Sequence, residues 1–322
     1  MTDAIGGYFG LELPTRSGML QNGILVNSGR NALEYILCVR GYKHVYIPYY
    51  TCDVVLEPFE KLGVSYSFYH IGWNLEPTEY PDLQDGEAFL YTNYFGLMDN
   101  AISRLVEKYG DRLIVDNAQA YFSKVRVGDQ FYSPRKFVGV PDGGIVALNP
   151  QLPYEELSDL ERDLSYQRME HMLMRLERGA EFGFKTFQKS RNVLKNQPIR
   201  LMSNLTQSLL KGIDFEYVRE KRIHNFRLLH QYLGAENELE LDIVINDNTV
   251  PLVYPFCTNR ASELRKRLFT ERVYPAQYWP NVMEWCAEND AEYMITKNTL
   301  ALPIDQRYGE EEMERIIEVV IG

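Results

Sequence analysis

The first 150 residues of the chain alternate short apolar segments with segments whose apolar residues recur at helical spacing. The apolar segments predict β-strands, because each is short and several end at Gly, Pro, Asn or Asp. The strands are expected over residues 23–27, 44–48, 64–69, 88–92 and 112–115, with helices over 31–39, 52–62 and 101–109. This alternation is typical of an α/β fold, in which helices cover both faces of a mostly parallel sheet.

The pattern changes near Pro150, after which longer helical segments follow. Apolar residues recur at helical spacing from 154 to 190, which predicts one long helix, and a second helix is expected over 214–233. Residues 1–150 are therefore expected to form a large α/β domain, and residues 151–235 a helical connection.

The last segment, residues 236–322, predicts a smaller α+β domain. Strands are expected over 250–256 and 300–303, with a helix over 261–270 between them. A final helix is expected where four apolar residues fall on one stripe, namely Met313, Ile316, Ile317 and Val320.

Composition restricts the partners and the compartment. The 322 residues carry a formal net charge of −11 at pH 7, so the chain is not expected to bind nucleic acid. No apolar run approaches the roughly 20 residues that cross a bilayer, and the first residues lack the pattern of a signal peptide. The cysteines are too far apart in the sequence for a zinc or redox motif: Cys38, Cys52, Cys257 and Cys286. We expect a cytoplasmic protein that binds no metal and no membrane.

Small residues stand where the first helix is expected to begin, in the order Ser28-Gly29-Arg30. The N-terminus of a helix presents backbone N–H groups and the positive end of the helix dipole, which together suit a phosphate. Serine is also a common N-cap residue. The pattern alone is consistent with either a phosphate site or an ordinary cap.

Two ionisable residues stand in settings that suit chemistry. Asp116 follows the strand over 112–115, and open α/β sheets bind ligands at the carboxyl ends of their strands. Lys136 lies among Phe, Val, Gly and Pro, before Gly143 and Gly144. Apolar surroundings favour the free amine of a lysine, which can form a Schiff base. The alternatives are a carboxylate that caps the next loop and a lysine that extends into solvent.

The order of these segments resembles the fold-type I pyridoxal-phosphate enzymes, and within them the DegT/StrS family of nucleotide-sugar aminotransferases. The resemblance rests on a phosphate-binding turn, an aspartate at a strand end with Gln119 three residues on, and a lysine seven residues before Gly-Gly. Further similar stretches cover 26–33, 47–51, 93–96 and 302–304.

The resemblance implies pyridoxal phosphate as the cofactor and a role for each matching residue. Lys136 would form the Schiff base and shuttle the proton, and Asp116 would face the pyridine nitrogen. Gln119 would approach the ring hydroxyl. The expected phosphate site comprises Ser28, Gly29, Arg30 and Ser133.

Some positions depart from the pattern of the family. The serine that the family places five residues before the lysine is replaced by Phe131, and Ser133 stands three before instead. Cys52 occupies the place of the ring-stacking aromatic, so Tyr50 or the adjacent Tyr49 is the candidate to cover the ring. The family's Asn-Tyr-Arg-Met stretch after the long helix is not found.

The resemblance implies a homodimeric aminotransferase that transfers an amino group, with glutamate as the donor, to a keto-sugar nucleotide. A sugar dehydratase that uses the aminated cofactor is one alternative, although dehydratases of the family replace the lysine. A non-catalytic relative that binds the cofactor is another. The basic segment over 189–200 is either a site for a nucleotide diphosphate or a solvated loop.

Overall fold

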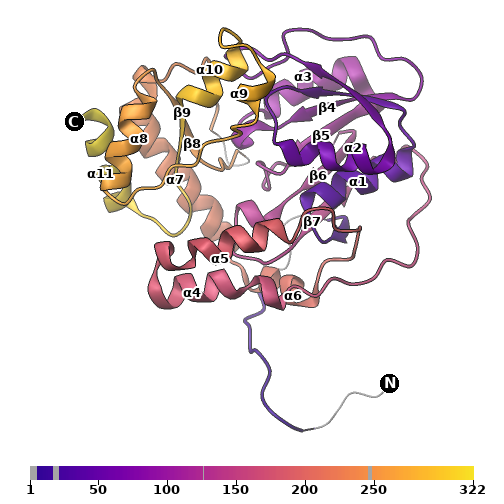
Figure 1. Cartoon of the computed structure of the whole chain (residues 1–322), viewed down its shortest axis with the longest axis horizontal. Helices are drawn as coiled ribbons and strands as arrows, with labels where there is room; N and C mark the ends of the chain where they lie inside the picture. The colour runs from indigo at the N-terminus through magenta and orange to yellow at the C-terminus, as the bar shows by residue number, and fades with distance from the viewer. Residues whose placement is uncertain (1–5, 17–21, 126, 246–248) are drawn as a thin grey trace.

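The computed structural model describes residues 6–16, 22–125, 127–245 and 249–322. The expected absence of a signal peptide rests partly on residues 1–5, which lie outside the described residues. A seven-stranded sheet with helices on both faces stands beside a two-stranded sheet with helices of its own (Figure 1). This confirms the expected α/β class. In the part of the chain that the structure describes, no helix is long and apolar enough to cross a membrane.

The large sheet has the strand order β1-β7-β6-β5-β4-β2-β3. All strands run parallel except β7, which is antiparallel to both β1 and β6. The expectation of a mostly parallel sheet is therefore confirmed. The strands are β1 (Ile24–Val26), β2 (His44–Pro48), β3 (Ser65–Tyr69), β4 (Glu87–Thr92), β5 (Leu113–Asn117), β6 (Asp129–Tyr132) and β7 (Gly144–Ala147).

Helices bury apolar residues on each face of this sheet. On one face, α1 (Gly29–Arg40) and α2 (Leu56–Leu62) pack over Val45 and Leu90. On the other face, α3 (Asp99–Tyr109) packs over Phe89 and Val115, and α6 (Asn204–Gly212), which was not predicted, adds Leu210 to the same core. The alternation of inward residues along β4 and β5 supplies both cores, because successive strand residues point to opposite faces.

The C-terminal part forms its own antiparallel pair, β8 (Tyr254–Cys257) with β9 (Thr299–Leu302). The expected strand over 250–256 therefore starts at Tyr254 instead. The pair packs against α7 (Phe215–Leu233), α8 (Ala261–Thr270) and α11 (Glu310–Ile321) around a core that includes Phe226, Leu264 and Met313. Two short helices, α9 (Val282–Trp285) and α10 (Ala291–Asn298), complete the unit.

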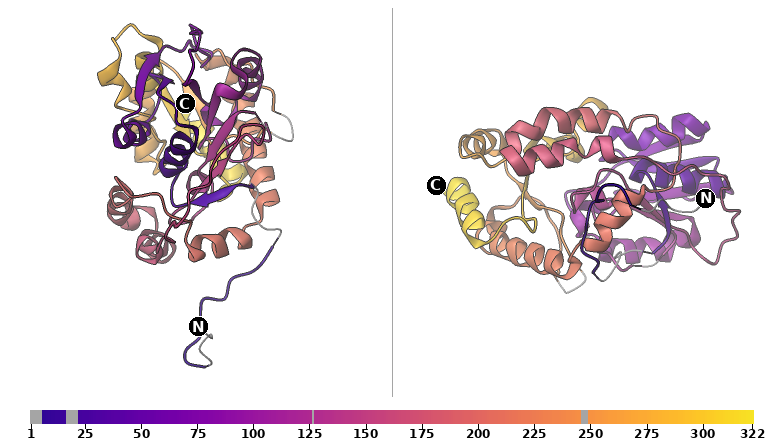
Figure 2. Two further views of the ribbon diagram at one scale, coloured as in Figure 1. Left: turned by 90° about the vertical axis from the view of Figure 1, so that its right-hand side faces the viewer. Right: turned by 90° about the horizontal axis from the view of Figure 1, so that it is seen from below.

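The prediction of one long helix over 154–190 is wrong. Most of residues 150–165 belong to no helix or strand, and a helical hairpin follows, formed by α4 (Glu170–Arg178) and α5 (Ala180–Asn192) (Figure 2). Gly179 joins the helices with φ of 90° and ψ of 178°, which ends α4. Gly183 permits their close packing, because a Cβ there would lie 2.8 Å from the His171 carbonyl oxygen.

The Gly143–Gly144 turn presses β7 against the start of α1. The backbone N–H of Gly143 donates to the Asn27 carbonyl oxygen at 2.8 Å. A Cβ on Gly144 would lie 2.1 Å from the Ser28 carbonyl oxygen and 2.9 Å from the Gly29 nitrogen. This backbone contact places the N-terminus of α1 next to the segment that leads from Lys136 to β7.

We expect Gly144→Ala to destabilise the protein by about 3 kcal/mol, because the added methyl overlaps backbone atoms that a rotamer change cannot move. Urea unfolding of the variant measures this loss. Gly139→Ala is the matched control, since a Cβ there meets only the Met172 sulfur at an ordinary 3.5 Å. Equal midpoints for the two variants would contradict the contact.

Candidate active site

The start of α1 forms one wall of the candidate site. Ser28 is the N-cap of α1: its Oγ accepts from the Asn31 backbone N–H at 3.2 Å and donates to the Asn31 Oδ1 at 2.6 Å. Ser133 lies against the same helix start, because a Cβ on Gly29 would be 3.4 Å from the Ser133 Cβ. The Ser28 hydroxyl is thus used in capping, while Ser133 is brought to the helix N-terminus.

Arg30 contributes to this wall through its backbone. Its guanidinium turns toward α2, where Nη1 pairs with the Glu57 Oε2 at 2.5 Å. Lys61 lies 3.7 Å from the other oxygen of Glu57. The Arg30 side chain is therefore already neutralised, and an anion at the helix start would meet the backbone of Arg30 rather than its charge.

Asp116 and Lys136 lie at the carboxyl edge of the sheet, close enough for their charges to interact. Asp116 ends β5 and is buried, and one of its oxygens accepts from the Ala118 backbone N–H at 2.8 Å. Burial raises the pKa of Asp116, while the Lys136 ammonium and the Ala118 N–H act in the opposite direction. The Lys136 side chain is exposed and borders a cavity, so a cationic atom is available beside a desolvated carboxylate.

Gln119 keeps an unused donor in the same region. Its Oε1 accepts from the Phe95 backbone N–H at 2.8 Å, which fixes the orientation of the amide. Its Nε2 is enclosed and has no hydrogen-bond partner among the described residues. A buried amide with an unused donor carries a free-energy penalty of about 1–3 kcal/mol that a ligand oxygen would remove.

The two candidate ring-covering tyrosines pack against other aromatic side chains. Tyr50 is fully buried, with its ring 4.9 Å from that of Trp279, and its backbone carbonyl accepts from the Tyr94 hydroxyl. The ring of Tyr49 stacks on Phe68 at 4.6 Å. Neither residue borders the cavity beside Lys136. The role of Tyr50 over a cofactor ring stays a prediction.

Cys52, rather than a tyrosine, is close enough to Lys136 for their charges to interact. Burial raises the pKa of the Cys52 thiol, and the positive charge of Lys136 offsets part of this rise. The Cys52 Sγ donates weakly to the Asp53 Oδ1 at 3.4 Å.

A cavity of about 820 Å³ opens beside Lys136. Its lining includes the segment 135–140, residues of the α4–α5 hairpin and residues 305–307. Apolar side chains of the hairpin form much of its lining, and Asp305 is the single carboxylate on it. Its basic side chains are Arg135, Lys136, Arg175, Arg222 and Arg307. A cavity of this charge suits an anionic ligand.

Arg222 is a site residue that our reading of the sequence missed. It lies on α7, almost completely buried, with its guanidinium 4.7 Å over the ring of Phe137. Its Nη2 donates to the Phe137 carbonyl at 3.2 Å, and the Gln306 Nε2 donates to the same oxygen at 2.9 Å. Burial lowers the pKa of Arg222 to about 10. A signal existed, since Arg222 falls four residues from both Val218 and Phe226 on the apolar stripe of its helix.

These residues fit pyridoxal phosphate. Gln119 supplies an unused amide donor, Asp116 a buried carboxylate and Lys136 an exposed amine, all at or after the carboxyl ends of β5 and β6. They would take the ring hydroxyl, the pyridine nitrogen and the aldehyde respectively. In the described residues, no group of three or more His, Cys, Asp or Glu side chains is arranged to hold a metal ion.

Solved structures with the same fold support this interpretation. A DegT DnrJ EryC1 StrS aminotransferase from Brucella abortus aligns over 92% of this chain and 84% of its own, with a TM-score of 0.63 and 16% identity. This chain has the DegT/DnrJ/EryC1/StrS aminotransferase fold. A putative sugar aminotransferase from Streptococcus pneumoniae, in its PMP form, aligns over 92% of this chain and 86% of its own, with a TM-score of 0.62 and 14% identity.

The DegT/DnrJ/EryC1/StrS fold also includes a dehydratase. The GDP-4-keto-6-deoxy-D-mannose-3-dehydratase from E. coli, with bound hydrated PLP, aligns over 92% of this chain and 86% of its own, at a TM-score of 0.59 and 12% identity. No family model matches the sequence, and no curated protein matches it. The reaction must therefore be argued from the site itself.

We expect Asp116→Asn to raise the stability of the cofactor-free protein at pH 7. Burial raises the pKa of Asp116, so the ionised carboxylate disfavours the folded state above the unfolded pKa of about 3.9. The neutral amide removes this cost, with a rise in Tm of roughly 2 °C for each kcal/mol recovered.

Thermal unfolding of both proteins between pH 3 and pH 8 measures the effect. The difference in Tm should shrink as the pH falls, because Asp116 is then neutral in both the folded and unfolded states. A variant that is less stable than the wild type at pH 7 would show that the carboxylate is stabilised within the empty site.

Proposed function

We propose that this chain is a pyridoxal-phosphate-dependent aminotransferase that transfers an amino group from glutamate to a keto-sugar nucleotide. The observation that carries the proposal is the placement of the buried Asp116 carboxylate beside the exposed Lys136 amine at the carboxyl edge of the sheet. Brought together with the unused Nε2 of Gln119, they match the polar groups of this cofactor. The cytoplasm is the proposed compartment.

The cofactor would supply an aldehyde that accepts amines and a ring that withdraws electrons from the bound carbon. Asp116 stabilises a proton on the ring nitrogen, because a desolvated carboxylate gains most from a nearby positive charge. Gln119 donates through Nε2 to the ring hydroxyl oxygen. The backbone of Gly29 and Arg30 and the hydroxyl of Ser133 bind phosphate oxygens at the start of α1.

Lys136 has two tasks in this proposal. Its Nζ holds the cofactor aldehyde in the resting enzyme, which is the nucleophilic use of a lysine amine. With an amino donor bound, the same Nζ would be the group that takes up and returns a proton at the reacting carbon. Retention of this lysine favours transamination over dehydration, although a dehydratase shares the fold.

Lys136→Ala should reduce amino transfer by about 1,000-fold or more, since it removes both the attachment point and the proton carrier. The wild-type protein with pyridoxal phosphate should show a visible absorption band that borohydride bleaches. The reduced cofactor should then be attached to the peptide that contains Lys136. Lys185→Ala, which removes an exposed lysine of α5, is the matched control.

The outcomes of this experiment separate the candidate functions. A colourless wild-type protein at saturating pyridoxal phosphate would exclude both enzymes. Cofactor binding without amino transfer to any nucleotide sugar in a screen would favour a non-catalytic relative. Release of water from a deoxygenated sugar nucleotide by the aminated cofactor form would identify a dehydratase.

A homodimer is part of the proposal. The α4–α5 hairpin exposes several large apolar side chains, among them Leu176 at 82% and Phe184 at 57% exposure. A second copy would cover such a surface, since single chains rarely expose large apolar patches. The hairpin also borders the cavity, so the partner subunit would lie next to the site.

Light scattering should therefore give twice the 37.6 kDa mass of the chain. Leu176→Glu should shift the protein toward the monomer and lower its activity, because a carboxylate would be buried in the interface. Ile321→Glu, at 50% exposure on the last helix, should leave the mass unchanged. A wild-type monomer with full activity would contradict the dimer.

A further inference from the structure

Arg135 is a partly buried arginine that has no ion-pair partner among the described residues. It directly precedes Lys136 and borders the same cavity. Within the described residues, it makes no hydrogen bond and no ion pair, and its Nε is enclosed without a partner. A buried charge without a partner is costly, so natural proteins keep one where a ligand of opposite charge compensates for it.

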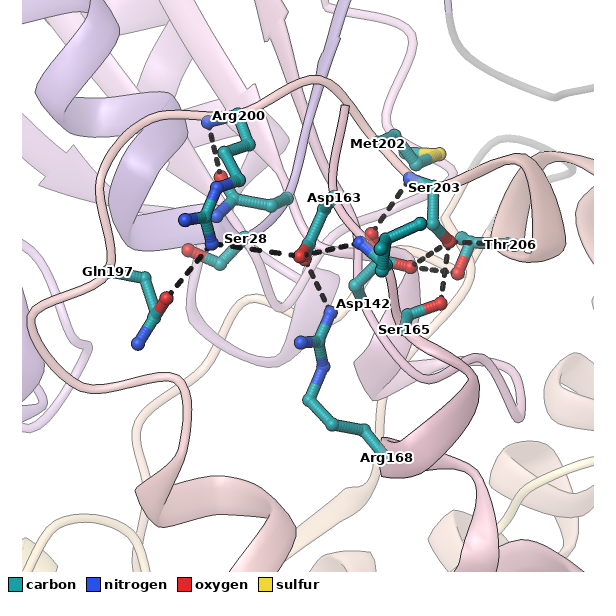
Figure 3. A network of polar contacts seen from close by, with 12 residues as sticks. Ser28, Asp142, Asp163, Ser165, Arg168, Gln197, Arg200, Met202, Ser203 and Thr206 are labelled. Carbon is teal, nitrogen blue, oxygen red and sulfur yellow. Dashed lines mark hydrogen bonds and ion pairs between the residues drawn. The ribbon is translucent and has the colours of Figure 1, made fainter. Parts of the chain in front are cut away.

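The neighbouring arginines differ from Arg135 in this respect. Arg30 pairs with Glu57. Arg168 pairs with Asp163, and the Arg200 Nη1 lies 3.9 Å from the same carboxylate (Figure 3). Three cations near the start of α1 therefore have carboxylate partners, while the one beside Lys136 has none.

The carboxylate of Asp142 is the opposite charge that acts on Arg135, but its oxygens are already used. It accepts from the Ser203 backbone N–H at 2.9 Å, from the Ser203 hydroxyl at 2.8 Å and from the Thr206 hydroxyl (Figure 3). Burial, together with the charges of Arg168 and Arg30, lowers the pKa of Arg135 to about 10. The environment of Arg135 thus carries excess positive charge.

The sequence around Arg135 lacks the serine that the resembling family uses. Phe131 stands at that position and is buried in the core, so it offers no donor. Ser133 lies at the start of α1. The positive charge of Arg30, the second residue of this helix, contributes to lowering the pKa of Arg135. Arg135 follows Ser133 by two residues, so its backbone lies close to the N-terminus of α1, where backbone N–H groups favour a phosphate.

We propose that Arg135 binds a phosphate group beside Lys136, and that this phosphate belongs to the cofactor. The inference rests on the proposed function. The planar guanidinium would bind two phosphate oxygens together and take over the role of the missing serine. A phosphate of the substrate has the same chemistry and is the other source that the experiment must separate.

The test compares the affinities of the cofactor-free protein for pyridoxal phosphate and for pyridoxal, which lacks the phosphate, by fluorescence titration. Arg135→Gln should weaken binding of pyridoxal phosphate by about 10- to 100-fold and leave binding of pyridoxal unchanged. Arg135→Lys should restore part of the loss, since it keeps the charge without the planar fork. Arg191→Gln removes a nearby exposed cation and should change neither affinity.

Titration of the cofactor-loaded proteins with uridine diphosphate forms the second arm. An unchanged ratio of the two cofactor affinities in Arg135→Gln overturns the assignment to the cofactor. In that case a weaker affinity for uridine diphosphate would show that Arg135 binds a phosphate of the substrate. An unchanged affinity for uridine diphosphate would show that Arg135 binds no phosphate. If Arg135→Gln fails to fold, the ratio of the affinities for pyridoxal phosphate and pyridoxal in Arg135→Lys decides whether Arg135 binds the cofactor phosphate. A wild-type protein that binds neither cofactor form would instead refute the proposed function.

Discussion

The contact between the Gly143–Gly144 turn and the start of α1 is the constraint on which the site depends. The Gly144 Cα touches the backbone of Ser28 and Gly29, where no side chain could fit. Because β7 is antiparallel to β6, the chain must reverse direction between these two strands. That reversal carries Lys136, so the turn holds the lysine segment and the helix N-terminus in one place.

The charges around this turn are arranged so that cations at the edge of the site remain available. Asp142, which is completely buried, uses its oxygens for the start of α6 instead of for Arg135. Glu57 and Asp163 neutralise the arginines farther from the cavity. Lys136 remains exposed opposite Asp116. The buried Asp116 carboxylate and the exposed Lys136 side chain are therefore available to a charged ligand. Keeping them so lowers the stability of the cofactor-free protein.

The sequence predicted the large sheet well because its strands and helices have strong, different periodicities. It could not reveal that β7 runs antiparallel, since an apolar strand reads the same in either direction. The α4–α5 hairpin was mistaken for one helix because helical spacing continues through Gly179, and only the packing of the two helices shows the reversal. Asp116 was found from its place at a strand end, Lys136 from its apolar neighbours in the sequence and Ser133 from the family resemblance. Arg222, in contrast, depends on contacts between residues far apart in the chain.

The small C-terminal unit contacts the large unit at two points, one of them next to Lys136. Arg222 and Gln306 both donate to the carbonyl oxygen of Phe137, the residue after Lys136. On the other side, the buried Glu292 of α10 accepts from the Ile71 backbone N–H at 2.7 Å, just beyond the end of β3. Since two donors share one carbonyl next to the lysine, a displacement of the small unit would move Lys136 relative to Asp116. Occupation of the cavity, which both units line, would therefore act directly on the position of the reactive amine.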